Sequence, residues 1–436
     1  MSEVADMPMT ESQSKAHSML HVAIVIEQFN PRAGGAERST AQIAQELVQR
    51  GHRVTVLAGA APDDLAVAEG VTLHAYSRHK VRSAARVLLF RRWALQRLAA
   101  GEFDVSLSIT MAVPADVIQP RAGTVREALV RSIAMRSSVA GRCFKRSLSL
   151  LSPKQQTMLF LERRAVADPA VGRFVAVSGY VREELRRHYD LAESRVEMIP
   201  NAAVMPTDAD ASQRAVWRDQ VRGAFGVPED AVLFLFPTQD PRRKGYQTLL
   251  GALRELARRE RRVVVLLAGM FGYRQHAQAV AAGVREQVRF VGPTRHMAPL
   301  YAAADATVLP TFYDPASKVV IESLMMGTPA ISSGCNGASE FILPPDSAAR
   351  GRVVNDPADD AALADAMLEL ADPRVRQACA QATAGLAEQL TMARHVDRLE
   401  RVLLEAARGA EVAPAGHDQV GSGGAGRRAR RRRGSG

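Results

Sequence analysis

Residues 21–57 have the sequence HVAIVIEQFNPRAGGAERSTAQIAQELVQRGHRVTVL, and this stretch decides the fold class. Residues 21–26 form an uninterrupted apolar run, which is typical of a buried strand. Residues 36–50 repeat apolar side chains at a spacing of about 3.6, which predicts a helix, and Gly51 follows as a helix-ending glycine. Residues 53–57 form a second apolar run. A strand, a helix and a strand in this order predict a parallel βαβ unit with helices on both sheet faces.

The same alternation continues along the chain, stops, and starts again. Before the interruption, we expect strands at residues 71–76 and 105–109 and a basic amphipathic helix at residues 81–100. The interruption is the polar segment PTDADASQ at residues 206–213, which predicts a linker. After it, apolar runs predict a helix at residues 245–258 and strands at residues 231–236, 262–267, 288–291 and 307–309. The chain therefore contains two consecutive α/β domains, and a ligand is expected in the cleft between the carboxyl ends of their strands.

The composition is that of a folded globular protein. Of the 436 residues, 47% are hydrophobic and 24% are charged, which excludes a mainly disordered or fibrous chain. No apolar run reaches about 18 residues, so no transmembrane helix is expected, and residues 1–18 lack the order of a signal peptide. The three cysteines are widely spaced and form neither a disulfide framework nor a zinc pattern. These features predict a soluble, cytoplasmic protein.

The net charge of +11 is concentrated at the C-terminus. Six of these charges are arginines at positions 427, 428 and 430–433, which leaves +5 for the rest of the chain. Because the body is only mildly basic, no specific nucleic-acid partner is expected. Residues 1–20 and the Arg-rich residues 411–436 are predicted to be disordered, since neither segment can bury a core.

A glycine pair follows the first predicted strand. Gly34 and Gly35 let the backbone approach a ligand closely, and the helix that starts behind them favours an anion. The alternative is an ordinary tight turn between a strand and a helix, and the glycine pair alone favours neither interpretation.

Three cations occupy the turn after the first strand of the second domain. Arg242, Arg243 and Lys244 lie at the carboxyl end of that strand, just before Gly245 and a predicted helix. This position suits a diphosphate, because arginine offers a planar pair of donors and lysine offers a point charge. The alternative, which an isolated RRKG sequence favours, is a solvated basic turn.

The most informative stretch is YDPASKVVIESLMMGTP at residues 313–329. Asp314 is expected in the loop after a strand, and Glu322 about two turns into the next helix. Ionised carboxylates are pure acceptors, so this pair can hold sugar hydroxyls. The N–H groups of residues 316–319 form the amino end of the helix and can bind a phosphate or sugar oxygen. The alternative is that Asp314 caps the helix and Glu322 is a surface acid.

Six motifs in this order resemble those of retaining glycosyltransferases of the GT-B fold, a family that includes sucrose synthase, glycogen synthase and lipopolysaccharide core glucosyltransferases. The resemblance covers roughly residues 21–405. Its motifs are the glycine pair, the interdomain segment VAVSGYVREEL to VEMIPNAAV at residues 175–204, the basic turn, VRFVGP at residues 288–293, the acid-x7-acid segment and NGASEFI at residues 336–342. Residues 114–120 and 151–166 resemble the lipopolysaccharide core subgroup most closely.

The resemblance implies two Rossmann-like domains that face a central cleft. An acceptor domain is expected at residues 21–206 and a nucleotide-sugar donor domain at residues 214–390, with a C-terminal helix at residues 391–410 crossing back to the first domain. The expected donor is UDP-glucose, bound without a cofactor or a metal. The donor-binding residues that the resemblance implies are Gly34, Gly35, Arg243, Lys244, Asp314, Ala316, Ser317, Lys318, Val319 and Glu322.

Roles also follow from the resemblance. Arg243 and Lys244 would neutralise the leaving diphosphate, Glu322 would hold the ribose hydroxyls, and Asp314 would face the donor sugar. Asp116 would act near the place where many relatives carry a histidine, so the implied catalytic set is Asp314, Arg243, Lys244 and Asp116. Anomeric configuration is retained, and no protein nucleophile is assigned. The chain departs from the family pattern at four positions, with Ala202 for glycine, Asp314 for glutamate, Ser317 for glycine and Lys318 for an apolar residue.

The family further implies a glycan or lipid-linked acceptor, in lipopolysaccharide or cell-envelope glycan synthesis. Residues 78–101 and 126–164 are basic segments with interleaved apolar residues, and they predict peripheral binding to the anionic inner face of the cytoplasmic membrane. The alternative for each segment is that its apolar side packs on the sheet.

Two other classes of function stay open. One is a GT-B nucleotide-sugar epimerase or a phosphorylase, which acceptor-dependent release of UDP would distinguish from a transferase. The other is a protein that binds RNA or anionic lipid through the arginine tail, although that tail explains only the last ten residues.

Overall fold

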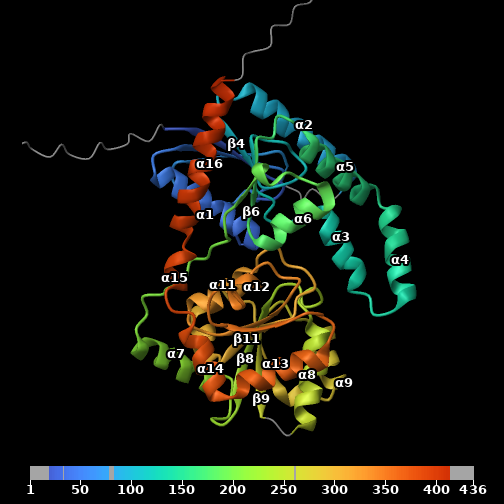
Figure 1. The fold of residues 1–436 in the computed structure, drawn as a ribbon, viewed down its shortest axis with the longest axis vertical. Helices are drawn as coiled ribbons and strands as arrows, with labels where there is room; N and C mark the ends of the chain where they lie inside the picture. The colour runs from blue at the N-terminus through green and yellow to red at the C-terminus, as the bar shows by residue number, and fades with distance from the viewer. Residues whose placement is uncertain (1–18, 33, 78–82, 260–261, 413–436) are drawn as a thin grey trace, which may run out of the picture.

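The protein consists of two α/β domains placed end to end along its long axis (Figure 1). The computed structural model describes residues 19–412, except residue 33 and residues 78–82 and 260–261. The terminal segments that were predicted to be disordered lie outside the described residues, apart from residues 19–20 and 411–412. Each domain contains one parallel sheet covered by helices, as the alternation of strands and helices predicts.

The N-terminal domain contains a seven-stranded sheet in the order β3-β2-β1-β4-β5-β6-β7. Its strands are β1 (His21–Ile26), β2 (Arg53–Ala58), β3 (Val71–Ala75), β4 (Val105–Ser108), β5 (Val117–Ile118), β6 (Arg173–Ala176) and β7 (Val196–Met198). Its helices are α1 (Gly35–Gln49), α2 (Ala84–Ala100), α3 (Val125–Ala134), α4 (Val139–Leu150), α5 (Pro153–Ala167) and α6 (Gly179–Tyr189). The order reverses between β1 and β4, so the loops that follow these strands diverge and leave room for a ligand.

The C-terminal domain contains a six-stranded sheet in the order β10-β9-β8-β11-β12-β13. Its strands are β8 (Val232–Thr238), β9 (Val263–Gly269), β10 (Val288–Gly292), β11 (Ala306–Leu309), β12 (Ala330–Ser333) and β13 (Gly351–Val354). Its helices are α7 (Ala211–Ala224), α8 (Tyr246–Arg258), α9 (Tyr273–Ala281), α10 (Ala298–Ala303), α11 (Lys318–Met325), α12 (Ser339–Ile342), α13 (Asp360–Ala371), α14 (Pro373–Gln381) and α15 (Leu386–Gln389). Here the order reverses between β8 and β11.

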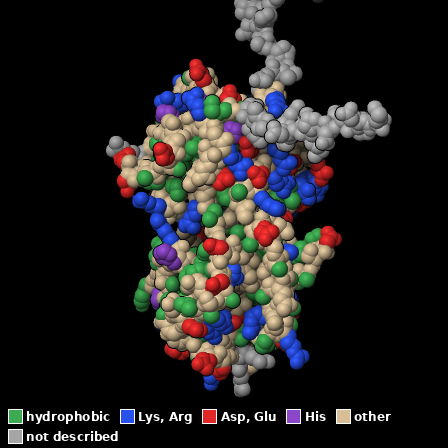
Figure 2. Space-filling model, turned by 90° about the vertical axis from the view of Figure 1, so that its left-hand side faces the viewer, with side chains coloured by type: hydrophobic (Ala, Val, Ile, Leu, Met, Phe, Trp, Pro, Cys, Tyr) green, Lys and Arg blue, Asp and Glu red, His purple; other side chains and the backbone are tan. Residues whose placement is uncertain are grey.

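Helix α16 (Met392–Val412) returns from the C-terminal domain to the N-terminal one (Figure 1). Its buried residues Met392, Val396 and Leu399 join the apolar core of the first sheet. The Glu400 carboxylate accepts a hydrogen bond from Arg50 at 2.9 Å and lies 2.9 Å from His52 Nε2. Basic and acidic side chains are interspersed over the face that carries this helix (Figure 2).

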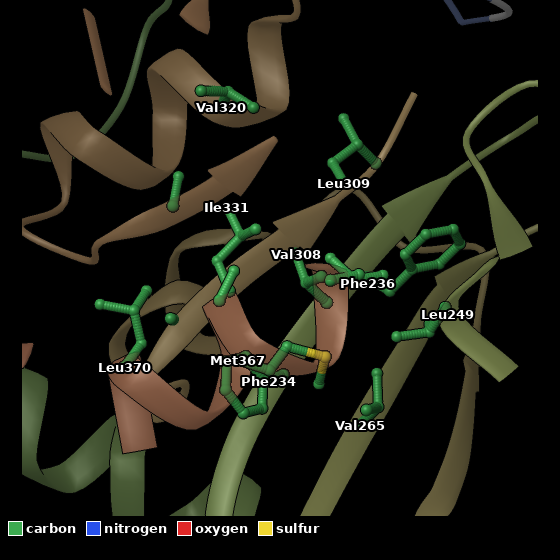
Figure 3. Close-up of a cluster of buried hydrophobic side chains, with 14 of the residues drawn as sticks. Phe234, Phe236, Leu249, Val265, Val308, Leu309, Val320, Ile331, Met367 and Leu370 are labelled. Atoms are coloured by element: carbon green, nitrogen blue, oxygen red, sulfur yellow. The ribbon is translucent and has the colours of Figure 1, made fainter. Parts of the chain in front are cut away.

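The core of the C-terminal domain contains side chains of β8 and β11 (Figure 3). Phe234 and Phe236 of β8 pack with Val308 of β11 and with side chains of α8 and α13, and all three are fully buried. These strands read as continuous apolar runs because parallel strands covered on both faces have no solvent side. The loops that follow them carry the basic turn and the acid-x7-acid segment.

Candidate active site at the domain interface

The loops at the carboxyl ends of the two sheets contact each other directly. The Ser178 hydroxyl, after β6, donates to the Pro315 carbonyl at 2.6 Å, and the Gly179 amide donates to Glu340 at 2.9 Å. Gly123 has φ +72°, and a Cβ there would lie 1.9 Å from the Tyr313 hydroxyl. Glycine therefore allows the loop after β5 to approach the loop that carries Tyr313. The acid-x7-acid segment therefore lies at the domain interface.

The basic turn is held against this segment by its backbone. The Phe312 amide and the Thr311 hydroxyl donate to the Arg243 carbonyl at 2.9 and 3.2 Å. Gly245 directly precedes α8 and has φ +82°, and a Cβ at this position would lie 2.1 Å from the Pro310 carbonyl oxygen. Only glycine fits such a backbone conformation and contact without strain.

The cations of the basic turn have different surroundings. The Lys244 ammonium is buried and forms a hydrogen-bonded ion pair with Asp314. Burial lowers the pKa of Lys244, and the Asp314 carboxylate opposes that shift. Arg243 is 46% exposed and pairs with Asp240 at 3.4 Å. The alternative of a wholly solvated turn is thus wrong for Lys244, because Lys244 is buried and binds Asp314, which lies on a loop distant in sequence.

Asp314 does not cap the following helix. Its amide donates to the Cys335 carbonyl at 3.0 Å, and its carbonyl accepts from the Gly337 amide at 2.9 Å. Ser317 is the residue that precedes α11, and its own amide donates to the Asn336 side chain at 3.1 Å. The Asp314 carboxylate is therefore available to Lys244 and to a ligand.

The amino end of α11 retains only part of the expected set of free backbone donors, since the Ser317 amide is already bonded. The first hydrogen bond of the helix runs from the Ile321 amide to the Ser317 carbonyl at 3.2 Å. The amides of Lys318 and Val319 precede it, so they have no partner inside the helix. The Ser317 amide already binds Asn336, and Ala316 contributes its carbonyl, which accepts from Asn201 at 2.8 Å.

Glu322 is buried and is not a surface acid. Since α11 begins at Lys318, Glu322 lies about one turn into the helix, and not two as expected. Its Oε2 accepts a hydrogen bond from the Tyr301 hydroxyl at 2.9 Å. Burial raises the pKa of Glu322, whereas Lys318, Tyr301 and Arg38 lower it.

The glycine pair lies beside α11. A Cβ built on Gly35 would lie 3.8 Å from Lys318 Cδ, while the nearest atoms to one on Gly34 belong to the Glu37 side chain of α1. The Lys318 ammonium donates to Ser39 and Gln42 of α1, each at 3.1 Å. Burial, with Arg121 and Arg38 nearby, lowers the pKa of Lys318 to about 8.

The predicted role of Asp116 is wrong. Asp116 precedes β5, so it lies at the amino end of the parallel sheet, whereas the other site residues follow strands. Its Oδ2 accepts hydrogen bonds from the Ser106 amide at 2.7 Å and the Ser106 hydroxyl at 2.6 Å. The carboxylate therefore joins two neighbouring strands and does not reach the domain interface.

A buried polar cluster at the interface was not predicted. The Arg121 guanidinium donates to Gln119 at 2.9 Å and also to Asn201, and Asn201 in turn donates to the Ala316 carbonyl. His395 of α16 lies against Arg121, and burial lowers the pKa of Arg121 to about 10. The sequence positions of these residues do not indicate that they are neighbours, because tertiary packing alone brings the loop after β5, the interdomain segment and α16 together.

The fold and these contacts define a class of protein. Two parallel-sheet domains meet at their carboxyl ends, where a basic turn, two carboxylates and a helix amino end converge, and this is the arrangement of a GT-B glycosyltransferase. Residues 230–373 match the family described as glycosyl transferases group 1, and residues 33–203 match glycosyltransferase family 4. The chain belongs to this family of group 1, family 4 glycosyltransferases.

Known proteins agree with this assignment. A probable transglycosylase of Burkholderia thailandensis is 30% identical over 284 residues, which are 62% of this chain and 72% of that protein. The structure of WaaG, a glycosyltransferase involved in lipopolysaccharide biosynthesis, has a TM-score of 0.71 at 20% identity and covers 88% of this chain and 99% of its own. The structure of Anabaena HepE in complex with UDP-glucose has a TM-score of 0.64 at 15% identity and covers 88% and 99%.

Proposed function

We propose that this protein is a retaining hexosyltransferase that moves glucose from UDP-glucose to a glycan or lipid-linked glycan. The observation that carries the proposal is the convergence of the Lys244–Asp314 ion pair, the amino end of α11 and the buried Glu322 at the domain interface. HepE was solved in complex with UDP-glucose and WaaG is involved in lipopolysaccharide biosynthesis, and both similarities support this choice of donor and pathway.

Each residue has a role in holding the donor. Arg243, Lys244 and the amides of Lys318 and Val319 bind the diphosphate, where negative charge develops as the glycosidic bond breaks. Glu322, held by the Tyr301 hydroxyl, accepts hydrogen bonds from the ribose. Asp314 accepts a hydrogen bond from a hydroxyl of the donor sugar. Gly35 lets the first domain close over the phosphates.

The chemical step that fits these roles needs no protein nucleophile. The acceptor oxygen bonds to the anomeric carbon on the face from which the diphosphate leaves, while the bond between that carbon and the phosphate oxygen breaks. The proton of the acceptor hydroxyl passes to the leaving phosphate oxygen. Configuration is retained because both groups use one face of the sugar.

Donor identity is tested with a panel of UDP- and GDP-sugars, scored by thermal shift and by nucleotide release. We expect UDP-glucose to give the largest shift and release of UDP that depends on acceptor. Release that does not depend on acceptor, or conversion of the donor to an epimer, would contradict transfer and support the epimerase class. A larger shift with a GDP-sugar would exclude the proposed donor.

The acceptor side of the proposal is peripheral membrane binding by the N-terminal domain. No helix in the described part of the chain is long and apolar enough to cross a membrane. On α4 and just after it, Phe144, Leu148 and Leu151 are 71%, 51% and 80% exposed. Lys145 and Arg146 lie on the same helix, so apolar and basic side chains are presented together, as on helices that lie in a membrane surface.

The two basic segments differ in their packing. Of the apolar residues on α2, Val87 and Phe90 are fully buried against the sheet, while Leu88 and Leu89 are about half exposed. Packing on the sheet therefore accounts for much of α2, and residues 78–82 of that segment lie outside the described residues. Helix α4, which projects from the domain in Figure 1, is the stronger candidate for the membrane.

Co-sedimentation with liposomes tests this part of the proposal. The protein without residues 421–436 should bind anionic vesicles but not zwitterionic ones, and salt should weaken the binding. Charge reversal at Lys145 and Arg146 should reduce binding more than charge reversal at Arg91 and Arg92 of α2. Absence of binding to anionic vesicles at low salt would contradict the proposal and indicate a soluble acceptor.

A further inference from the structure

A cavity of about 380 Å³ opens between α3, α5 and α6 of the N-terminal domain, away from the domain interface. Its size lies within the range of small-molecule sites. Two of these helices, α3 and α5, lie next to α4 (Figure 1). The lining residues are Arg126, Gln156, Leu159, Phe160, Arg163, Arg187, His188 and Tyr189.

The lining is basic, with three arginines, one histidine and no carboxylate. One acid beside the cavity is Glu127, whose Oε2 lies 3.1 Å from Arg187 and 2.7 Å from His188. Its other oxygen accepts hydrogen bonds from Arg131 at 2.6 Å and from the Tyr180 hydroxyl at 2.8 Å. Glu127 therefore offsets positive charge only on the side of the cavity formed by Arg187 and His188.

The side chains of the other two arginines, Arg126 and Arg163, are not paired with a carboxylate in the described residues. A second acid, the buried Glu162, lies against the lining residues, and its oxygens accept hydrogen bonds from the Val125 and Arg126 amides and from the Tyr189 hydroxyl. Within the described residues, the guanidinium groups of Arg126 and Arg163 form no ion pair. Two guanidinium groups without an ion-pair partner beside one cavity favour an anionic ligand, since guanidinium matches phosphate oxygens in pairs.

One wall of the cavity is apolar. Leu159 is partly exposed and Phe160 is 55% exposed, with the Arg164 guanidinium 5.7 Å from the Phe160 ring centre. Both residues belong to α5, which directly follows the exposed Leu148 and Leu151. An anion-binding wall next to an apolar wall suits a ligand in which a phosphate is joined to acyl chains.

We propose that this cavity binds the phosphate headgroup of one anionic glycerophospholipid, with Arg126 and Arg163 on the phosphate and Leu159 and Phe160 against the start of the acyl chains. The inference rests on the membrane binding proposed above and adds a defined headgroup site to it. Charge on α4 attracts any anionic surface, whereas the cavity selects a phosphate within it.

The test uses the full chain and monomeric dihexanoyl phosphatidylglycerol, followed by thermal shift, with inorganic phosphate at the same concentration in parallel. Two double variants remove the same charge: R126Q/R163Q inside the cavity and R142Q/R146Q on α4. A third variant, Leu159→Trp, fills the cavity without changing charge. We expect the lipid to raise the melting temperature of the wild type and of R142Q/R146Q, but not that of R126Q/R163Q or Leu159→Trp.

Anionic-vesicle binding separates the two proposals. The cavity variants should bind phosphatidylglycerol vesicles at least about tenfold more weakly than wild type, the loss expected for charge-assisted contacts to one phosphate. Wild-type binding to vesicles, with no response to monomeric lipid, would overturn the cavity site and leave the membrane proposal intact. An equal response to inorganic phosphate would also overturn it, because the cavity would then recognise a free anion.

Discussion

The two domains hold their charged side chains in different ways. In the C-terminal domain, the buried Lys244 is paired with Asp314 and the buried Glu322 with the Tyr301 hydroxyl. In the N-terminal domain, Phe144 of α4 and Leu151 just after it are exposed to solvent, and among the described residues Arg126 and Arg163 of the neighbouring helices form no ion pair. A ligand of fixed shape needs groups that are already positioned, whereas a fluid surface needs only charge and apolar area. The contrast supports a donor site in the second domain and an acceptor surface on the first.

The sharpest way to break this contrast is to remove Lys244. Lys244→Ala should lower catalytic efficiency by at least about a hundredfold and the free energy of unfolding by about 3 kcal/mol, because Asp314 is left half-buried without its cation. Steady-state kinetics and urea unfolding measure the two effects. The double variant K244M/D314N should recover much of the stability and none of the activity. Unchanged stability in Lys244→Ala would mean that the ion pair does not form.

Glu322→Gln tests the buried carboxylate at nearly constant shape. Affinity for UDP should fall by about tenfold or more, since a hydrogen bond to a charged acceptor is worth about 1.5–3 kcal/mol. Isothermal titration calorimetry measures this affinity for UDP. Tyr301→Phe is the matched control, because it removes only the hydroxyl that holds Glu322 and should weaken UDP binding less. Equal UDP affinity in wild type and Glu322→Gln would exclude the ribose role.

Arg243→Ala completes the comparison within the basic turn. Arg243 is 46% exposed and its ion pair with Asp240 is on the surface, so the free energy of unfolding should stay within about 0.5 kcal/mol of wild type. Catalytic efficiency should still fall by about tenfold through the lost diphosphate contact. A stability loss as large as that of Lys244→Ala would mean that the two cations do not differ in burial.

Sequence order predicted the position of the acid-x7-acid segment well because its parts are local. A strand, a loop and a helix place Asp314 and Glu322 at one sheet edge once the strands are known to be parallel. The same rule excludes the role predicted for Asp116, because Asp116 precedes its strand and so lies at the opposite edge of the sheet. The burial of Lys244 and the cluster of Arg121, Asn201 and His395 could not be predicted, since each depends on partners more than 60 residues away that only the packed domains bring together.

The smallest expected effect is a pH dependence at the point where the domains touch. The pKa of Lys318 is lowered to about 8 by burial, whereas a lysine in the unfolded chain keeps a pKa of about 10.4. Between these values the unfolded chain binds more protons, so the contribution of Lys318 to stability increases as pH rises through this window. The difference in unfolding free energy between wild type and Lys318→Met should therefore shift in favour of wild type by up to about 1 kcal/mol per pH unit from pH 8 to 10. Urea unfolding across that range measures the shift, with Lys145→Met on α4 as the control away from the interface. Parallel curves for wild type and Lys318→Met would show that the ammonium is not buried between α11 and α1, and contact between the two domains would then not require desolvation of this charge.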